Sequence, residues 1–320
     1  MNHRSLLRVA FLAALFLGFS QAGGSCVQFD GQHVRVHVDA ERDRLDLQIV
    51  YRDLHATQSN LDGALTQLDQ LRAGQRWFAL ISNWPFMLNM DSVLADPPEA
   101  GSTGAALLTA LDTGLQVRPG ELWTDEQGRL CASQLVRLQG LDTLVAAING
   151  YLLSVLDDAK LRTKFLEDLG VTDSASHALF DAAIQQRSPL LERRGASFAF
   201  TLPVNDAGFA QLARRFLVQL DQADTLVPSP APLDDPSATE LDQLLEWLAA
   251  NDLALERRRD RISLVLGDPT AAEWAFVTPP TARPQPGSLG AALAERGWTI
   301  HGPEHEERVN AAFAAFVSEP

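Results

Sequence analysis

Two histidines and a glutamate near the end of this 320-residue chain have the spacing of a catalytic zinc signature. His301, Glu304 and His305 fit the pattern H-x-x-E-H, in which two imidazoles bind the metal and the carboxylate activates a water molecule. That chemistry needs both imidazoles on one face of a helix, one turn apart. Gly302 and Pro303 break such a helix, and Pro303 is better placed at the first position of a helix that begins here. The sequence therefore predicts a last helix at this motif and no catalytic metal site.

Three further histidines lie between residues 33 and 55. His33 and His37 are four residues apart on a predicted strand and share one face, where they could bind a metal together with His55. No Cys, Asp or Glu is spaced to complete a tetrahedral set of ligands. A solvated strand face is the simpler interpretation, and we predict neither a metal ion nor another cofactor.

The sequence carries no signature of nucleophilic catalysis or of phosphate binding. It has no G-x-S-x-G elbow, no phosphate-binding loop and no G-x-G-x-x-G fingerprint. Its 41 acidic residues leave open a pair of carboxylates of the kind that glycosidases use. We predict no catalytic residue, and the sequence alone leaves open whether the protein is an enzyme.

One apolar segment is a candidate for contact with another protein. It contains Trp84, Phe86, Met87 and Met90. Flexible methionines beside aromatic rings suit adaptable contact surfaces. An exposed segment of this kind predicts a docking site for a partner, whereas a buried one is a loop that crosses the core.

The first residues have the three parts of a secretory signal peptide. Two arginines precede an uncharged apolar run, Val9–Phe19, and Ser20-Gln21-Ala22 follows as a small-x-small cleavage site. The run is short for a membrane span, which takes about 20 residues, and no later stretch is long and apolar enough. The sequence thus predicts a signal peptide over residues 1–22 and a mature bacterial protein in the periplasm or outside the cell, without a transmembrane helix.

The two cysteines of an exported chain can form one disulfide bond. We predict a bridge between Cys26 and Cys131, which closes a loop of roughly 100 residues and stabilises the fold by about 4 kcal/mol. Two buried thiols are the alternative. In a further alternative Cys26 carries a lipid anchor, although Gly23 is a poor match to the apolar residue that lipoprotein signals usually have three positions before the cysteine.

The charge balance excludes several classes of partner. With 41 acidic against 26 basic side chains, the net charge is −15, so nucleic-acid phosphates and anionic membrane surfaces would repel the protein. No basic stripe with interleaved aromatic residues is present, and we predict no nucleic-acid partner. The 46% of hydrophobic residues indicates a folded protein and excludes a chain that is disordered throughout.

Strand-like alternation and helical spacing together predict an α+β fold, with short antiparallel hairpins or a meander covered by amphipathic helices. Asp30-Gly31 is a turn signal between two short strands, and Arg44–Arg52 alternates apolar with polar residues, which predicts one buried and one wet face. Leucines at helical spacing over 61–71 and 141–155 predict the covering helices. Tight turns between the early strands argue against a parallel α/β sheet.

A proline-rich stretch divides the chain. Asp221–Pro236 contains four prolines and is predicted to be a linker. Residues 23–220 would form the α+β domain, and residues 237–320 a smaller, mostly helical C-terminal lobe that is separate or packed on the first.

These features together favour one function and leave a second open. We expect an exported, non-enzymatic module that binds a protein, a peptide or an envelope component. The alternative is an extracytoplasmic hydrolase that uses carboxylates which the sequence does not identify. The sequence gives neither the partner nor the oligomeric state.

Overall fold

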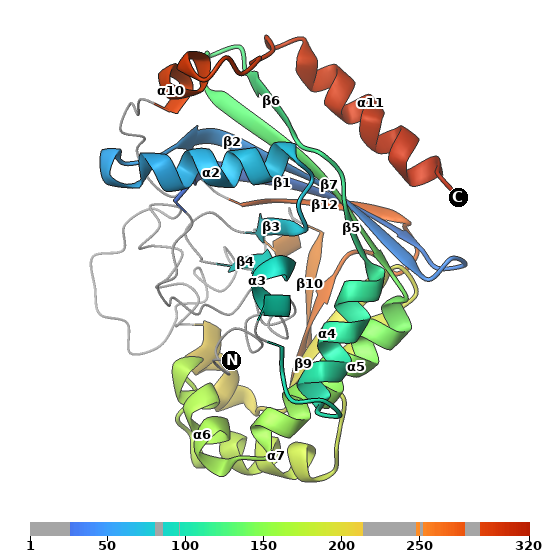
Figure 1. Cartoon of the computed structure of the whole chain (residues 1–320). Coiled ribbons are helices and arrows are strands. Elements are labelled where there is room, and N and C mark those ends of the chain that lie inside the picture. The colour runs from blue at the N-terminus through green and yellow to red at the C-terminus, as the bar shows by residue number, and fades with distance from the viewer. Residues whose placement is uncertain (1–25, 81–85, 96, 214–247, 250–251, 279–288) are drawn as a thin grey trace, which may run out of the picture.

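The computed structural model describes residues 26–80, 86–95, 97–213, 248–249, 252–278 and 289–320. They form two antiparallel sheets, a short hairpin and a set of helices, as Figure 1 shows. The predicted α+β class is therefore confirmed, including antiparallel pairing and a helical C-terminal region.

The large sheet has six strands. Five follow the order β12-β1-β2-β7-β5, and β6 also pairs with β7. The strands are β1 (Gln28–Asp39), β2 (Arg44–His55), β5 (Leu115–Val117), β6 (Glu121–Thr124), β7 (Leu130–Gln139) and β12 (Glu273–Thr278). Each of them pairs antiparallel with its neighbours.

The second sheet has the order β10-β11-β9-β8, and β3 and β4 form a separate hairpin. These strands are β3 (Trp77–Leu80), β4 (Phe86–Asn89), β8 (Leu191–Arg194), β9 (Ser197–Leu202), β10 (Leu253–Arg258) and β11 (Arg261–Leu266). Because β11 pairs with β9 and β12 pairs with β1, residues from both sides of the predicted linker share both sheets. The linker, Asp221–Pro236, lies outside the described residues, so the division into domain and lobe stays a prediction.

The helices form at the two predicted leucine repeats and at several further places. They are the 3-10 turn η2 (Gln58–Asn60) and the α-helices α2 (Leu61–Arg72), α3 (Met90–Ala95), α4 (Thr103–Gly114), α5 (Leu141–Leu156), α6 (Ala159–Asp168), α7 (Ser174–Gln185), α10 (Leu289–Glu295) and α11 (His305–Ser318). None of those in the described part of the chain combines the length and apolar character that a membrane crossing needs.

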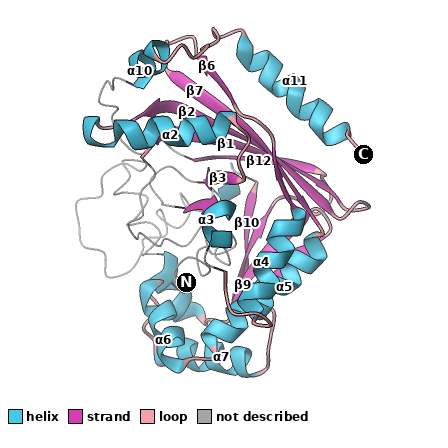
Figure 2. Ribbon diagram, in the orientation of Figure 1, coloured by secondary structure: helices cyan, strands magenta, loops and turns pink. Residues whose placement is uncertain are grey.

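The main core lies on one face of the large sheet. Side chains at alternate positions of β1 and β2, such as Val34, Val36 and Ile49, belong with Leu68 of α2 and Ile148 of α5 to one continuous buried cluster. Figure 2 shows α2 on this side of the sheet and α11 on the other. The large sheet is thus covered by helices on both faces, and only one of these faces is apolar.

The first strand differs from the prediction at Asp30-Gly31. Both residues lie within the 12-residue strand β1, and Gly31 stands opposite Arg52 of β2. The predicted turn at this point is therefore wrong. Pairing with β2 along most of β1 outweighs the local turn preference of an Asp-Gly pair.

Candidate functional site

The large sheet presents its charged side chains on the face opposite the core, which we call the outer face. The outer-face residues of β1, β2 and β7 lie opposite one another across the sheet. For example, Arg35 of β1 lies opposite Gln48 of β2, which lies opposite Leu135 of β7. The outer face consists of His33, Arg35 and His37 of β1, of Arg44, Asp46, Gln48, Val50 and Arg52 of β2, and of Cys131, Ser133, Leu135 and Arg137 of β7. The alternation predicted for β1 and β2 is confirmed.

Helix α11 lies along the outer face and contacts β2, β6 and β7 (Figures 1 and 2). Its buried side chains form one stripe at helical spacing: His305, Val309, Phe313 and Phe316. Beneath the helix, Arg44 and Asp46 are only 2% and 0% exposed. The prediction that this face of β2 is wet is therefore wrong, because a helix from the far end of the chain covers it.

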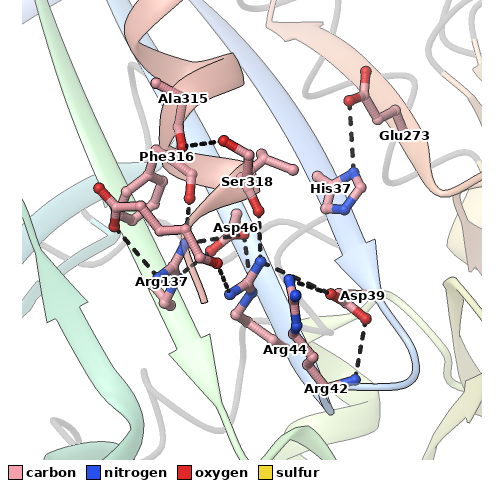
Figure 3. Close-up of polar contacts among 12 residues, drawn as sticks. His37, Asp39, Arg42, Arg44, Asp46, Arg137, Glu273, Ala315, Phe316 and Ser318 are labelled. Atoms are coloured by element: carbon pink, nitrogen blue, oxygen red, sulfur yellow. Dashed lines mark hydrogen bonds and ion pairs between the residues drawn. The ribbon is translucent and has the colours of Figure 1, made fainter.

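Asp46 is buried between two arginines, as Figure 3 shows. Its carboxylate accepts a hydrogen bond of 2.6 Å from Arg137 Nε and lies 3.2 Å from Arg44 Nε. A buried carboxylate is tolerated when such partners compensate for its lost hydration. The three side chains together carry one net positive charge, and they face the C-terminal end of α11, where the helix dipole is negative.

The same two arginines cap the end of α11 (Figure 3). Arg44 donates hydrogen bonds to the carbonyl oxygens of Val317, at 2.6 Å, and Glu319, at 2.8 Å. Arg137 donates one to the carbonyl oxygen of Phe316. The last four carbonyl groups of a helix lack the usual intrahelical partner. The Glu319 amide donates to the Phe316 carbonyl over 3.3 Å, and Arg44 satisfies the Val317 carbonyl, which would otherwise need water.

Arginine side chains also form the surface on which the α11 phenylalanines pack. The guanidinium carbon of Arg35 lies 4.9 Å from the ring centroid of Phe313. That of Arg137 lies 4.3 Å from the ring centroid of Phe316, and Arg118 approaches the same ring to 5.7 Å. Cation–π contacts of this kind allow an apolar stripe to pack on a charged sheet.

Histidines and a carboxylate hold the other end of α11. The ring of His305 stacks on that of His301 with centroids 4.0 Å apart and planes 9° apart, and its Nε2 atom contacts the carboxylate of Glu121. Parallel rings at this distance do not direct their nitrogen atoms to a common point. In the part of the chain that the structure describes, no three His, Cys, Asp or Glu side chains form a group that could hold a metal ion.

Helix α11 begins two residues later than the sequence predicts. Pro303 and Glu304 form a turn, in which the His305 amide donates to the Gly302 carbonyl and the Glu306 amide to the Pro303 carbonyl. The proline and the preceding glycine thus separate the helix from the strand-like segment before it.

The other predicted histidines do not gather into one site. His33 and His37 share the outer face, as predicted. His37 Nδ1 lies 3.5 Å from the carboxylate of Glu273 on β12 (Figure 3), whereas His55 Nδ1 is 2.9 Å from the backbone carbonyl of Asp53. The three imidazoles therefore have separate surroundings.

His33 lies beside an ion pair that ties the sheet to α11. Arg52 Nη2 is 2.6 Å from the carboxylate of Glu306 in the first turn of the helix. Burial lowers the pKa of His33 below its ordinary value, and the charges of Arg52 and Arg35 lower it further, while Glu306 opposes them.

We expect acid to weaken the fold through His33. Because folding lowers the pKa of His33 from 6.5, the unfolded chain binds more protons than the folded chain once the pH falls below that value, and the free energy of unfolding decreases. In a His33→Gln variant this part of the acid sensitivity should be lost, which urea unfolding over a pH series would measure. The wild-type protein, unfolded over the same pH series, is the reference. An unaltered profile in His33→Gln would contradict the expectation.

The site thus consists of a charged sheet face that is covered by α11. No family profile, curated protein or solved structure matches the chain.

The predicted disulfide bond is wrong, because both cysteines are free. Cys131 is buried on the outer face in a small satellite core with Val50, Trp123 and Val309 of α11. Burial raises the pKa of its thiol, which disfavours the reactive thiolate.

Cys26 belongs to the other side of the large sheet. It packs against the main core beside α2, where a Cβ atom added to Gly63 would come within 2.5 Å of its sulfur. The sheet separates this thiol from Cys131, and sequence spacing carries no information on that separation. A lipid anchor at Cys26 stays a prediction.

The predicted contact segment is only partly described. Met90 begins α3 and is fully buried, so it is part of the core. Trp84 lies outside the described residues, as do the side chains of Phe86 and Met87. For these three residues a contact with a partner stays a prediction.

Proposed function

We propose that the protein is an exported, non-enzymatic binding module whose outer face receives a helical segment of a protein partner. The observation that carries the proposal is the way in which the outer face binds α11. Arg44, Arg137 and Gln48 donate to main-chain carbonyl groups of the helix. Every helix presents such groups, and those at its C-terminal end are free. A surface that binds them suits helices whose sequences differ from that of α11.

The side-chain contacts indicate which helices would fit. The guanidinium groups of Arg35 and Arg137 accept an aromatic stripe such as Phe313 and Phe316, three residues apart. Arg118 Nη2 lies 2.7 Å from the carboxylate of Glu319, just beyond the helix. A partner helix should therefore combine an aromatic or aliphatic stripe with an acidic residue near its C-terminal end.

The place where binding occurs follows from the signal-peptide pattern, which is part of the same proposal. Cleavage after residue 22 would release the module into the periplasm or the medium, and the alternative is a lipid-anchored form held through Cys26. The segment with Trp84, Phe86 and Met87 is a second contact region in this proposal. Its aromatic and methionine side chains suit an adaptable surface.

A labelled peptide with the sequence of residues 303–320 tests the proposal, because it presents the helix in trans. In the intact protein α11 competes with it at an effective concentration on the order of millimolar, so binding to the wild type should be weak. A Phe313→Ala change in the protein weakens the competing helix and leaves the outer face intact. This variant should bind the wild-type peptide at least about tenfold more tightly than the wild-type protein does.

The same change in the peptide provides the matched control. A peptide with Phe313→Ala should lose at least about tenfold in affinity for the same protein variant, so one substitution has opposite effects in the two molecules. Fluorescence anisotropy measures both affinities, and circular dichroism verifies that the protein variant is folded. Absence of saturable binding to the folded Phe313→Ala protein would refute the proposal.

A further inference from the structure

The chain that leads to α11 is fixed to the sheet up to one residue before the Gly302-Pro303 pair. The His301 amide donates to the Leu122 carbonyl over 3.2 Å, and the Thr124 amide donates to the His301 carbonyl over 2.9 Å. Trp298 lies under the guanidinium of Arg72 on α2, 4.4 Å from it. A change of direction at Gly302-Pro303 would therefore move α11 alone.

The pair has the properties of a hinge. Gly302 has no Cβ and tolerates a wide range of backbone angles, and the following proline disfavours the helical conformation at Gly302. The pair thus prevents α11 from extending into the preceding segment as one continuous helix, in whichever direction α11 points. Besides the turn at residues 302–304, the stacking of His301 on His305 and the contact of His305 with Glu121 bridge this connection, and both can re-form when the helix comes from another copy.

Several contacts that hold α11 lie beyond this hinge and come from the sheet. Arg52 binds Glu306, Gln48 binds the Val309 carbonyl, and Arg44 binds the Val317 carbonyl. A helix supplied by another copy of the chain would make the same contacts on the same outer face. Exchange of the helix then costs the rearrangement of the hinge and the entropy of association, and it retains the remaining interactions.

We propose that a second copy of this chain is a partner of the outer face, with the two copies exchanging α11 across Gly302-Pro303 to form a symmetric dimer. This inference rests on the proposed function, since it needs an outer face that accepts a helix in trans. The arginines of the outer face attract the end of the exchanged helix. The net charge of −15 repels the two bodies, so added salt should favour the dimer.

The satellite core offers a direct test, because Cys131 of β7 and Val309 of α11 belong to it together. The full mature chain with Cys26→Ser and Val309→Cys has one thiol on the sheet and one on the helix. After incubation at high concentration and high salt, analytical ultracentrifugation should detect a dimer. Mild oxidation should then link residue 131 of one copy to residue 309 of the other, as a dimer band on a non-reducing gel and mass spectrometry of the linked peptides would show.

A variant with Cys131→Ser in addition is the matched control and should give no linked dimer. The inference is overturned if the chain with wild-type cysteines stays monomeric at every concentration and salt level. It is equally overturned if the dimer forms but lacks the link between residues 131 and 309 of different copies. Binding of the 303–320 peptide to a strictly monomeric protein would remove the exchange dimer and leave the proposed function standing, whereas failure of both experiments removes both.

Discussion

Replacement of Asp46 by alanine is expected to lower the free energy of unfolding by about 3–5 kcal/mol. Asp46 is fully buried and is the carboxylate that both Arg44 and Arg137 contact. Its removal leaves two buried guanidinium groups next to each other, with only the more distant and more exposed carboxylates of Asp39, 3.8 Å from Arg44, and Glu319, 3.6 Å from Arg137. The urea midpoint of the variant, compared with that of the wild type, measures the effect.

Two further variants test whether the charge of Asp46 causes this loss and whether its burial sets the size of the loss. Asp46→Asn keeps the size of the side chain and an acceptor oxygen, so a loss close to that of alanine would identify the charge as the cause. Asp39 also lies near Arg44, at 3.8 Å, but it is partly exposed, and Asp39→Ala should cost less than about 1 kcal/mol. Equal losses at positions 39 and 46 would contradict the argument.

Two glycine-to-alanine changes are expected to act in opposite directions. Gly120 lies where the turn between β5 and β6 crosses the end of α2, and its amide donates to the Leu71 carbonyl over 2.8 Å. An added Cβ would lie 2.0 Å from Leu71 Cδ2 and 2.6 Å from the Ser133 carbonyl oxygen. The backbone oxygen belongs to a paired strand, so we expect Gly120→Ala to cost about 3 kcal/mol.

Gly150 in α5 is the matched position, because a Cβ added there meets no atom outside its own stretch of helix backbone within 4 Å. Alanine has the higher helix propensity, so Gly150→Ala should stabilise the protein by about 0.5–1 kcal/mol. Thermal and urea unfolding of the two variants measure the loss of stability expected for Gly120→Ala and the gain expected for Gly150→Ala. A Gly120→Ala variant as stable as the wild type would show that the turn can move away from both α2 and β7.

The elements that depend on local signals were predictable. The leucine spacing of 61–71 and 141–155 predicts α2 and α5, and the alternation after Arg44 predicts β2. The turn predicted at Asp30-Gly31 was wrong because a turn preference is local, whereas the strand that replaces the turn is stabilised by pairing with β2.

The candidate site was predictable only in part. The polar alternation of β2 places Arg44, Asp46 and Gln48 on one face, but the alternation is the same for a wet face and for one that a helix covers. One signal of the cover was present. Val50 falls on the polar side of β2 and Leu135 on that of β7, and such apolar residues suit a covered face, although single ones are also common on faces that stay in water. Which helix covers the face depends on contacts between residues that are far apart in the sequence, and no local pattern encodes such contacts.

The cysteines illustrate the same limit. Their number and the predicted export made a bridge reasonable, yet the distance between two thiols depends on the path of the chain around the sheet. Cys26 and Cys131 lie on opposite faces, so no bond can form without breaking the sheet.

The antiparallel pairing of β1 with β12 joins the first described strand to one that lies near the end of the chain. Pairs so distant along a polypeptide close late, because a very long loop has to be ordered first. Until residues 273–278 are available, the edge of the large sheet beside β1 has no partner. In the export proposed above, this delay would leave the polypeptide unfolded enough to pass through a narrow channel before the sheet is completed.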